Sequence, residues 1–177
     1  MELDLEQIGA MHPMLQRVEE AAKYRRSGAR ALSRAKHAPG VLARVENGGE
    51  VGQATIRWAP PPDVALALDL SDDKRVTEDG AEAVALAFVH ACSGWSVSRR
   101  IQQGGSGDWL LTSPSKKKMT LALEVSGTVT DDARRRLTVK LAQVAGVTEK
   151  RCVRAAVVVA FVGPEVLAAT VEGEAVP

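Results

Sequence analysis

Aromatic residues are the scarcest class in this 177-residue sequence, where three Trp, two Phe and one Tyr make up 3% of the chain. Proteins that hold single-stranded nucleic acid without sequence preference stack successive bases on aromatic side chains. The composition therefore argues against such a base-stacking platform. Apolar residues still make up 45% of the chain, so we expect an ordered core in which Ala and Val take the place of aromatic rings.

Cysteines are few, and long hydrophobic runs are missing from the sequence. Cys92 and Cys152 stand at the edges of predicted core elements, apart from any second thiol pair or His cluster. This placement favours small buried hydrophobes over a disulfide or a zinc site. The longest apolar stretch, residues 154–164, is too short to cross a bilayer. Residues 1–10 lack the basic start and apolar run of a signal peptide, so we expect a cytoplasmic protein without membrane contacts.

The net charge of +1 conceals an uneven distribution of charge along the chain. Residues 46–82 contain nine acidic and three basic residues, whereas residues 98–154 contain twelve basic and five acidic residues. A basic half around buried carboxylates would suit a polyanion whose phosphates approach a metal ion. Solvated faces and loops are the alternative explanation, and they are the usual location of charge runs.

The first 70 residues predict a small N-terminal module. The 3–4 spacing of apolar residues predicts a helix over 12–36 with a basic outer face. Asn47 and the two glycines after it predict the turn of a β-hairpin within 41–58, and a further strand is expected over 64–70. We expect residues 1–70 to be an accessory unit for partner or dimer contacts, and residues 71–177 to form the core.

The core segment alternates helices and strands. A buried helix is expected from Thr77, its candidate N-cap, to the residue before Gly94. The elements expected after it are strands over 95–101, 108–112 and 119–127, a helix over 130–146 capped by Thr130, a strand over 155–162, and a short helix or turn over 164–173. The order α-β-β-β-α-β predicts an α/β (α+β) fold with a mixed sheet and helices on both faces.

Two acidic residues interrupt the otherwise apolar strands of this core. Glu124 lies between Leu123 and Val125, and Asp108 begins the preceding strand. If these strands are neighbours, the two carboxylates lie close enough to repel each other unless a proton or a cation intervenes. Their oxygens suit Mg²⁺ or Mn²⁺, and such an ion can activate water and stabilise charge on a phosphodiester.

A third acid, Glu82, lies in the first turns of the buried helix and could also face the metal. An acid near a helix start is stabilised by the helix dipole, and for Glu82 alone that explanation is favoured. Asp108 could likewise be a turn residue that begins a strand. Glu124 is the acid that these structural explanations account for least.

The segments around these acids, "GAEAVALAFVHACSGWSVSRRI", "GSGDWLL" and "LALEVSG", resemble the core of the restriction-endonuclease-like PD-(D/E)XK superfamily. The resemblance covers about residues 77–163 in element order and in acids, and residues 1–70 have no counterpart in it. It implies an αβββαβ core and a Mg²⁺- or Mn²⁺-dependent nuclease, with DNA favoured over RNA as the substrate. It also implies Asp108 and Glu124 as metal ligands, with Glu82 as an accessory acid for metal or water.

The sequence departs from the family at the motif lysine, because Glu-x-Lys is replaced here by Glu124, Val125 and Ser126. Ser126 can hydrogen-bond a water molecule but cannot supply the positive charge that orients water and offsets phosphate charge. Lys140 lies at the border of the apolar stripe of the 130–146 helix and could extend its ammonium to the site. An ordinary surface lysine is the favoured alternative for Lys140. The expected catalytic set is Asp108, Glu124, Ser126 and Lys140.

Three functions remain open on these observations. The first is a metal-dependent nuclease, acting in a homodimer or larger complex such as a restriction or defence system. The second is a catalytically inactive relative that binds nucleic acid or protein through surfaces such as the 12–36 helix, and the third is an unrelated α/β protein. The residues expected to contact nucleic acid are Arg99, Arg100, Lys116, Lys117, Lys118, Arg134 and Arg135.

Overall fold

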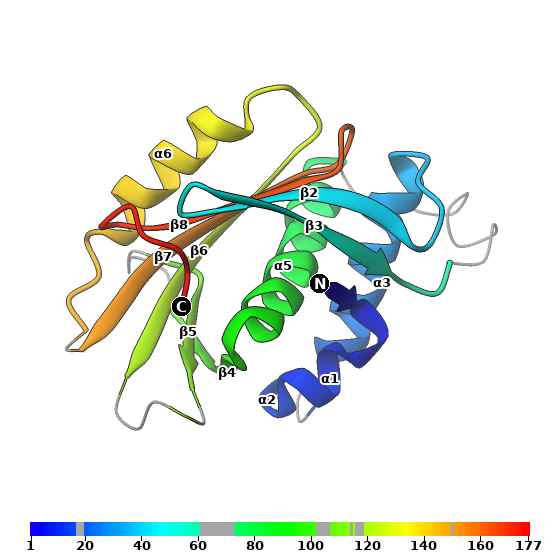
Figure 1. The fold of residues 1–177 in the computed structure, drawn as a ribbon. Helices are drawn as coiled ribbons and strands as arrows, with labels where there is room; N and C mark the ends of the chain where they lie inside the picture. Colours follow the sequence, from blue (N-terminus) through cyan, green and yellow to red (C-terminus); the bar gives the residue numbers. More distant parts are fainter. Residues whose placement is uncertain (17–19, 61–72, 102–106, 114, 116–118, 150) are drawn as a thin grey trace.

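The computed structural model describes residues 1–16, 20–60, 73–101, 107–113, 115, 119–149 and 151–177. Within these residues the chain forms one mixed eight-stranded sheet of order β1-β3-β2-β8-β7-β6-β5-β4, with helices on both faces (Figure 1). The strands are β1 (Glu2–Asp4), β2 (Val41–Asn47), β3 (Glu50–Arg57), β4 (Ser96–Arg100), β5 (Trp109–Thr112), β6 (Thr120–Thr128), β7 (Cys152–Ala160) and β8 (Glu165–Thr170). The helices are η1 (Leu5–Gln7), α1 (Ile8–Met11), α2 (Pro13–Gln16), α3 (Glu20–Arg34), α5 (Asp73–Ser93) and α6 (Ala133–Val144).

The predicted α/β class and mixed sheet are confirmed, and the order α5-β4-β5-β6-α6-β7 follows the expected series. Strands β4, β5 and β6 pair antiparallel, as short connections allow. Strand β7 then pairs parallel with β6, which requires a long crossover because both strands run the same way. Helix α6 is that crossover, and it lies on the face of the sheet opposite α5 (Figure 1).

Strand β6 shows how the sequence distributes side chains between the two faces. Leu121, Leu123 and Val125 belong to the hydrophobic cluster that includes α5. Because successive strand residues point to opposite faces, Glu124 and Ser126 lie on the other face, where both contact α6. The alternation therefore places the acidic residue of β6 under α6, away from the main core.

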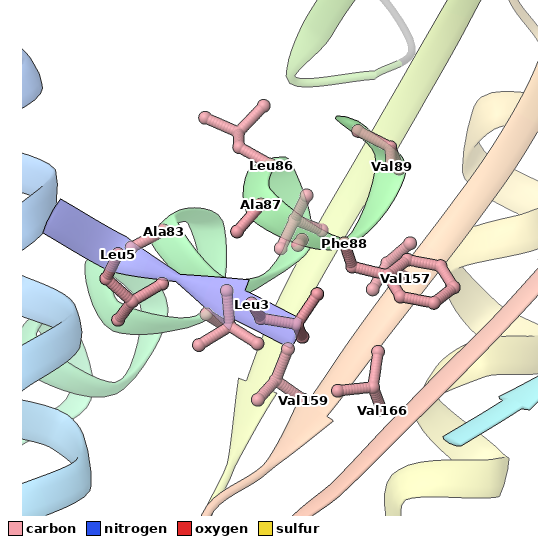
Figure 2. Close-up of a cluster of buried hydrophobic side chains, with 14 of the residues drawn as sticks. Leu3, Leu5, Ala83, Leu86, Ala87, Phe88, Val89, Val157, Val159 and Val166 are labelled. Atoms are coloured by element: carbon pink, nitrogen blue, oxygen red, sulfur yellow. The ribbon is translucent and has the colours of Figure 1, made fainter. Parts of the chain in front are cut away.

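The main core is built from aliphatic side chains, as the composition predicts. Leu3 and Leu5 from the N-terminal segment meet Phe88 of α5 and Val159 of β7, and each is at most 1% exposed (Figure 2). Burying a side chain of this size contributes about 1.5–3 kcal/mol. The N-terminal segment therefore packs directly onto the core helix, and α3 covers the same helix from outside.

Close packing of α5 on β6 depends on Gly127. A Cβ at that position would lie 2.3 Å from the backbone oxygen of Thr77. We expect Gly127→Val to lower the free energy of unfolding by about 2 kcal/mol, because the helix must move off the sheet, as urea denaturation can measure. Gly52→Val in β3 is the control, since the described residues leave open space there. An equal loss in the two variants would contradict this explanation.

The N-terminal module is only partly as predicted. The β2–β3 hairpin is confirmed, with Gly48 and Gly49 at positive φ of 57° and 89° in its turn. Residues 2–11 add β1, η1 and α1, which the periodicity did not predict. Strand β2 pairs parallel with β8, so strands from both ends of the chain share one sheet. The strand expected over 64–70 and the expected boundary at residue 70 lie outside the described residues.

Both helix caps predicted in the core are wrong. Helix α5 begins at Asp73, so Thr77 lies inside it and its Oγ1 donates to the Asp73 carbonyl at 2.8 Å. Helix α6 begins at Ala133, and Thr130 hydrogen-bonds the carboxylate of Asp132 before it. A threonine that can hydrogen-bond nearby backbone suits a cap and a first turn alike, so the residue type alone does not determine the boundary. The predicted helix end is confirmed, because Gly94 follows α5 at φ 69°.

The C-terminal element was predicted wrongly as a helix or turn. Residues 165–170 form β8, which pairs antiparallel with β7 and parallel with β2. Residues 166–170 are all buried, as in an interior strand covered on both faces, and this produces a continuous apolar run without alternation. Periodicity cannot separate such a run from a buried helix.

Two smaller expectations concern the cysteines and the membrane. Cys92 and Cys152 are free thiols of intermediate burial in the described chain, and burial raises the pKa of Cys92 to about 11, so its thiol is protonated at neutral pH. Among the residues that the structure describes, no helix is both long and apolar enough to span a membrane.

Candidate functional site

Glu124 and Lys140 form a close ion pair between β6 and α6. The Lys140 Nζ donates to Glu124 Oε1 at 2.5 Å, and the two side chains are 24% and 9% exposed. Burial raises the pKa of Glu124, while the ammonium of Lys140 counteracts that rise and the charge of Asp108 adds to it. The lysine charge that the sequence lacks at position 126 thus reaches Glu124 from the following helix.

Asp108 lies directly beside Glu124 at the start of β5. Its neighbour Trp109 pairs with Leu123, and the Asp108 amide donates to the Leu123 carbonyl at 2.9 Å. The Asp108 side chain turns toward β6, where its Oδ2 accepts from the Val125 amide at 2.8 Å. The predicted juxtaposition of the two acids on neighbouring strands therefore holds in the structure.

Glu82 approaches the same place from α5, but it is paired with Arg100. The Arg100 guanidinium donates to Glu82 Oε2 at 2.5 Å and to the Tyr24 hydroxyl at 2.9 Å, and it lies 4.7 Å from the Trp109 ring centroid. Burial raises the pKa of Glu82, Arg100 and Tyr24 oppose the rise, and Asp108 adds to it. The charge of Asp108 therefore raises the pKa of both Glu82 and Glu124.

Arg136 is a second cation of α6 that contacts this strand, and the sequence interpretation missed it. Its Nη1 lies 3.5 Å from Ser126 Oγ. Four helix residues rise about 6 Å and two strand residues about 6.7 Å, so the steps from Arg136 to Lys140 and from Ser126 to Glu124 match in length. The sequence has two cations four residues apart on the predicted helix, Arg136 and Lys140. It also has two polar residues two apart on the predicted strand, and this matched spacing was a signal that the side chains meet.

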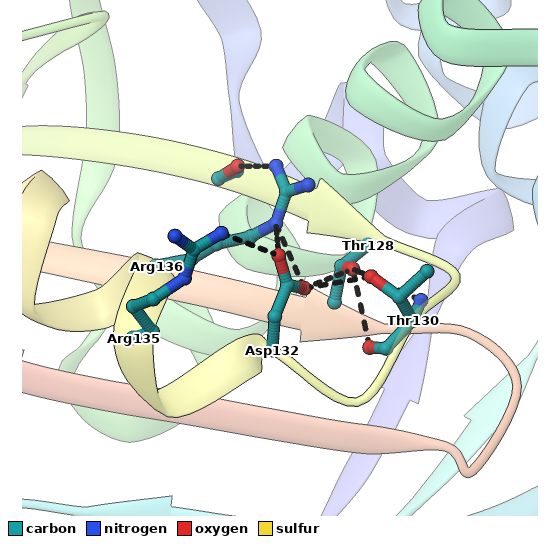
Figure 3. A network of polar contacts seen from close by, with 6 residues as sticks. Thr128, Thr130, Asp132, Arg135 and Arg136 are labelled. Carbon is teal, nitrogen blue, oxygen red and sulfur yellow. Dashed lines mark hydrogen bonds and ion pairs between the residues drawn. The ribbon is translucent and has the colours of Figure 1, made fainter.

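A polar network fixes the position of Arg136 (Figure 3). Its Nε donates to both carboxylate oxygens of Asp132, at 2.9 and 2.8 Å. Thr128 and Thr130 donate to the same carboxylate at 2.6 and 2.9 Å, and these contacts hold the pKa of Asp132 well below its usual range, with the Thr128 hydroxyl as the main cause. The start of α6 is therefore tied to the end of β6, which sets how α6 lies over the acids.

The other residues predicted to contact nucleic acid lie at separate places in the described structure. Arg99 is 3.6 Å from Glu149, and Arg134 binds both oxygens of Glu46. Arg135 is 83% exposed in its side chain and lies 3.6 Å from Asp132. Lys116, Lys117 and Lys118 lie outside the described residues. Of the members of this set that the structure describes, only Arg100 contacts one of the three acids, Glu82.

The donors at the site are compatible with a hard divalent cation. In the described contacts Asp108, Glu124 and Glu82 use Oδ2, Oε1 and Oε2 respectively. Two carboxylates with water and substrate phosphate oxygens are a usual set for Mg²⁺, and Asp108 with Glu124 would supply them. Among the described residues no three Asp, Glu, His or Cys side chains form a group that could hold a metal ion, and Glu82 is paired with Arg100.

Comparisons of this chain with known protein families, curated proteins and solved structures found no match.

Proposed function

We propose that this protein is a metal-dependent nuclease that hydrolyses phosphodiesters in DNA. The observation that carries the proposal is the position of the Lys140 ammonium, 2.5 Å from Glu124 Oε1, with Asp108 at the start of the neighbouring strand. A lysine paired with Glu124 would provide the positive charge that the motif lysine otherwise supplies. The order α5-β4-β5-β6-α6-β7, with two antiparallel pairings and one parallel pairing, supports a restriction-endonuclease-like core.

The residues would divide the chemistry as follows. Asp108 and Glu124 would hold Mg²⁺ or Mn²⁺, which supplies Lewis-acid activation of water and stabilises charge on the phosphate. Lys140 orients Glu124 and is placed to hydrogen-bond an attacking water. Ser126 lies two residues after Glu124 on β6, and Arg136 contacts it from α6. Together they could hold a phosphate oxygen. Glu82, held by Arg100 and Tyr24, adds negative charge beside Asp108 and so favours the bound cation.

A second function is favoured by one specific observation. Each acid already has a protein donor, namely the Val125 amide, Lys140 or Arg100. A catalytically inactive relative would keep such pairs as structural contacts and bind nucleic acid or protein without a metal. The two functions differ in whether Glu124 binds a divalent cation.

We expect Glu124→Gln to abolish metal binding and to reduce plasmid cleavage by about a thousandfold or more, because loss of a metal ligand removes several kcal/mol of transition-state stabilisation. Calorimetric titration with Mn²⁺ and a cleavage assay on the same samples measure both effects. Glu50→Gln is the matched control, since Glu50 is exposed at the β2–β3 turn. Wild-type protein that neither binds metal nor cleaves would refute the nuclease and favour the inactive relative.

A further inference from the structure

A basic groove lies between α3 and α5 on the outer side of the helical layer. Its hollow has a volume of about 200 Å³ and is lined by Lys23, Arg26, Ser27, Arg30, Arg75, Val76 and Asp79. Four cationic side chains and one acidic side chain line it. We call these seven residues the basic groove.

The single acid of the groove does not neutralise it. Asp79 Oδ2 lies 3.3 Å from Lys23 Nζ and 3.9 Å from Arg75 Nε. Ion pairs of this exposed kind contribute about 0–1 kcal/mol, so they can give way to a stronger anion. Arg26 is exposed and the side chain of Arg75 is 74% exposed, which leaves both guanidinium groups accessible to a partner.

The groove adjoins the acidic site through both of its helices. Asp79 and Glu82 are i, i+3 neighbours on the surface of α5. On α3, Lys23 immediately precedes Tyr24, whose hydroxyl accepts from Arg100 beside Glu82. A chain-like ligand that leaves the groove at this end therefore passes close to Glu82.

The dimensions and chemistry of the groove fit a row of phosphates. The seven helical steps from Lys23 to Arg30 rise about 10 Å along α3. One strand of B-DNA presents a phosphate about every 3.4 Å of its axis, so the groove spans about three nucleotides. Arginine forks suit phosphate oxygens. The apolar member, Val76, is 6% exposed, so the lining of the groove offers little apolar surface for insertion into a membrane.

We propose that the basic groove binds the sugar–phosphate backbone of DNA and leads it past Glu82. Binding of DNA in the groove does not rest on the proposed nuclease function. The residues of the basic groove are different from the predicted contact residues Arg99, Arg134 and Arg135.

The test is binding of a fluorescein-labelled DNA duplex by anisotropy, without divalent metal, at about 50 and 200 mM salt. The Arg26→Ala/Arg75→Ala double variant should bind roughly tenfold or more weakly at the lower salt, and its log–log salt slope should fall by about 2 because two phosphate contacts are lost. Arg57→Ala is the matched control, since Arg57 is 60% exposed in its side chain on β3. Arg135→Ala reports on the α6 surface, and circular dichroism checks that each variant is folded.

The possible results separate the groove from the catalytic proposal. A selective loss of affinity and slope in the double variant supports the groove, even if wild-type protein does not cleave DNA. Unchanged binding in the double variant overturns it, even if cleavage depends on Glu124. Loss of binding in Arg135→Ala alone, absence of wild-type binding, or binding only to phosphatidylserine vesicles also overturns it.

Discussion

Replacing Lys140 by methionine is expected to lower the free energy of unfolding by about 3 kcal/mol at neutral pH. The side chain of Glu124 is 9% exposed, and without Lys140 its carboxylate would be left buried and unpaired. Methionine keeps most of the aliphatic volume, so the loss reports on charge and not on packing. Urea denaturation of wild type and Lys140→Met, analysed with the same m-value for both proteins, measures the difference in the free energy of unfolding.

The same variant should regain stability as the pH falls. Burial raises the pKa of Glu124, and removing the opposing lysine raises it further. A folded-state pKa above the unfolded value means that the native state binds more protons, so stability is retained below that pKa and lost as the pH rises through it. The defect of Lys140→Met is therefore largest at neutral pH and smaller in mild acid.

A double variant is the control for this pair. Glu124→Gln/Lys140→Met removes both charges while keeping both shapes, and it should be more stable than Lys140→Met alone at neutral pH. If the single and double variants are equally stable, Glu124 is solvated and the buried-pair explanation is wrong.

Acidification should destabilise the wild-type protein through His12. The ring is fully buried, with Nε2 3.1 Å from the Leu86 carbonyl and Nδ1 3.2 Å from the Val97 amide. The amide can only donate, so Nδ1 accepts and Nε2 carries the single proton of a neutral ring. Burial is the main cause that lowers the pKa of His12 from 6.5 to about 4.

The lowered pKa of His12 determines whether stability rises or falls with pH, and over which pH range it changes. Between pH 6.5 and about 4 the unfolded state binds the proton and the native state does not, so stability is full above pH 6.5 and falls as the pH drops toward 4. The shift corresponds to about 3 kcal/mol. It is measured as the pH dependence of the urea midpoint.

The comparison with His12→Gln isolates this contribution, since glutamine can keep one donor and one acceptor without titrating. Glu82 and Glu124 have raised pKa values and act in the opposite sense, but they contribute equally to both proteins. The difference between the two stability curves should therefore narrow or reverse as the pH falls through this window. Parallel curves would show that His12 does not titrate differently on folding.

Much of the candidate site could be predicted because its signals are local. Glu124 stands out between Leu123 and Val125 in an apolar strand, and Asp108 begins the strand before it. The border position of Lys140 on its helix allowed its ammonium to reach the acids, although an ordinary surface lysine was favoured, and the ammonium does contact Glu124. Tyr24 could not be predicted, because it lies 76 residues from the Arg100 that binds it and no local pattern links them.

The sequence by itself determined the α-β-β-β-α-β series, the aliphatic core and the side of β6 on which its acid lies. These follow from periodicity and side-chain alternation, which act over a few neighbouring residues. Only the tertiary structure decided that residues 165–170 form a strand, that β2 pairs with it, and that α3 lies against α5 to form the basic groove. Such contacts join segments far apart in the chain, and they form because buried backbone and apolar faces must find partners that no local pattern specifies.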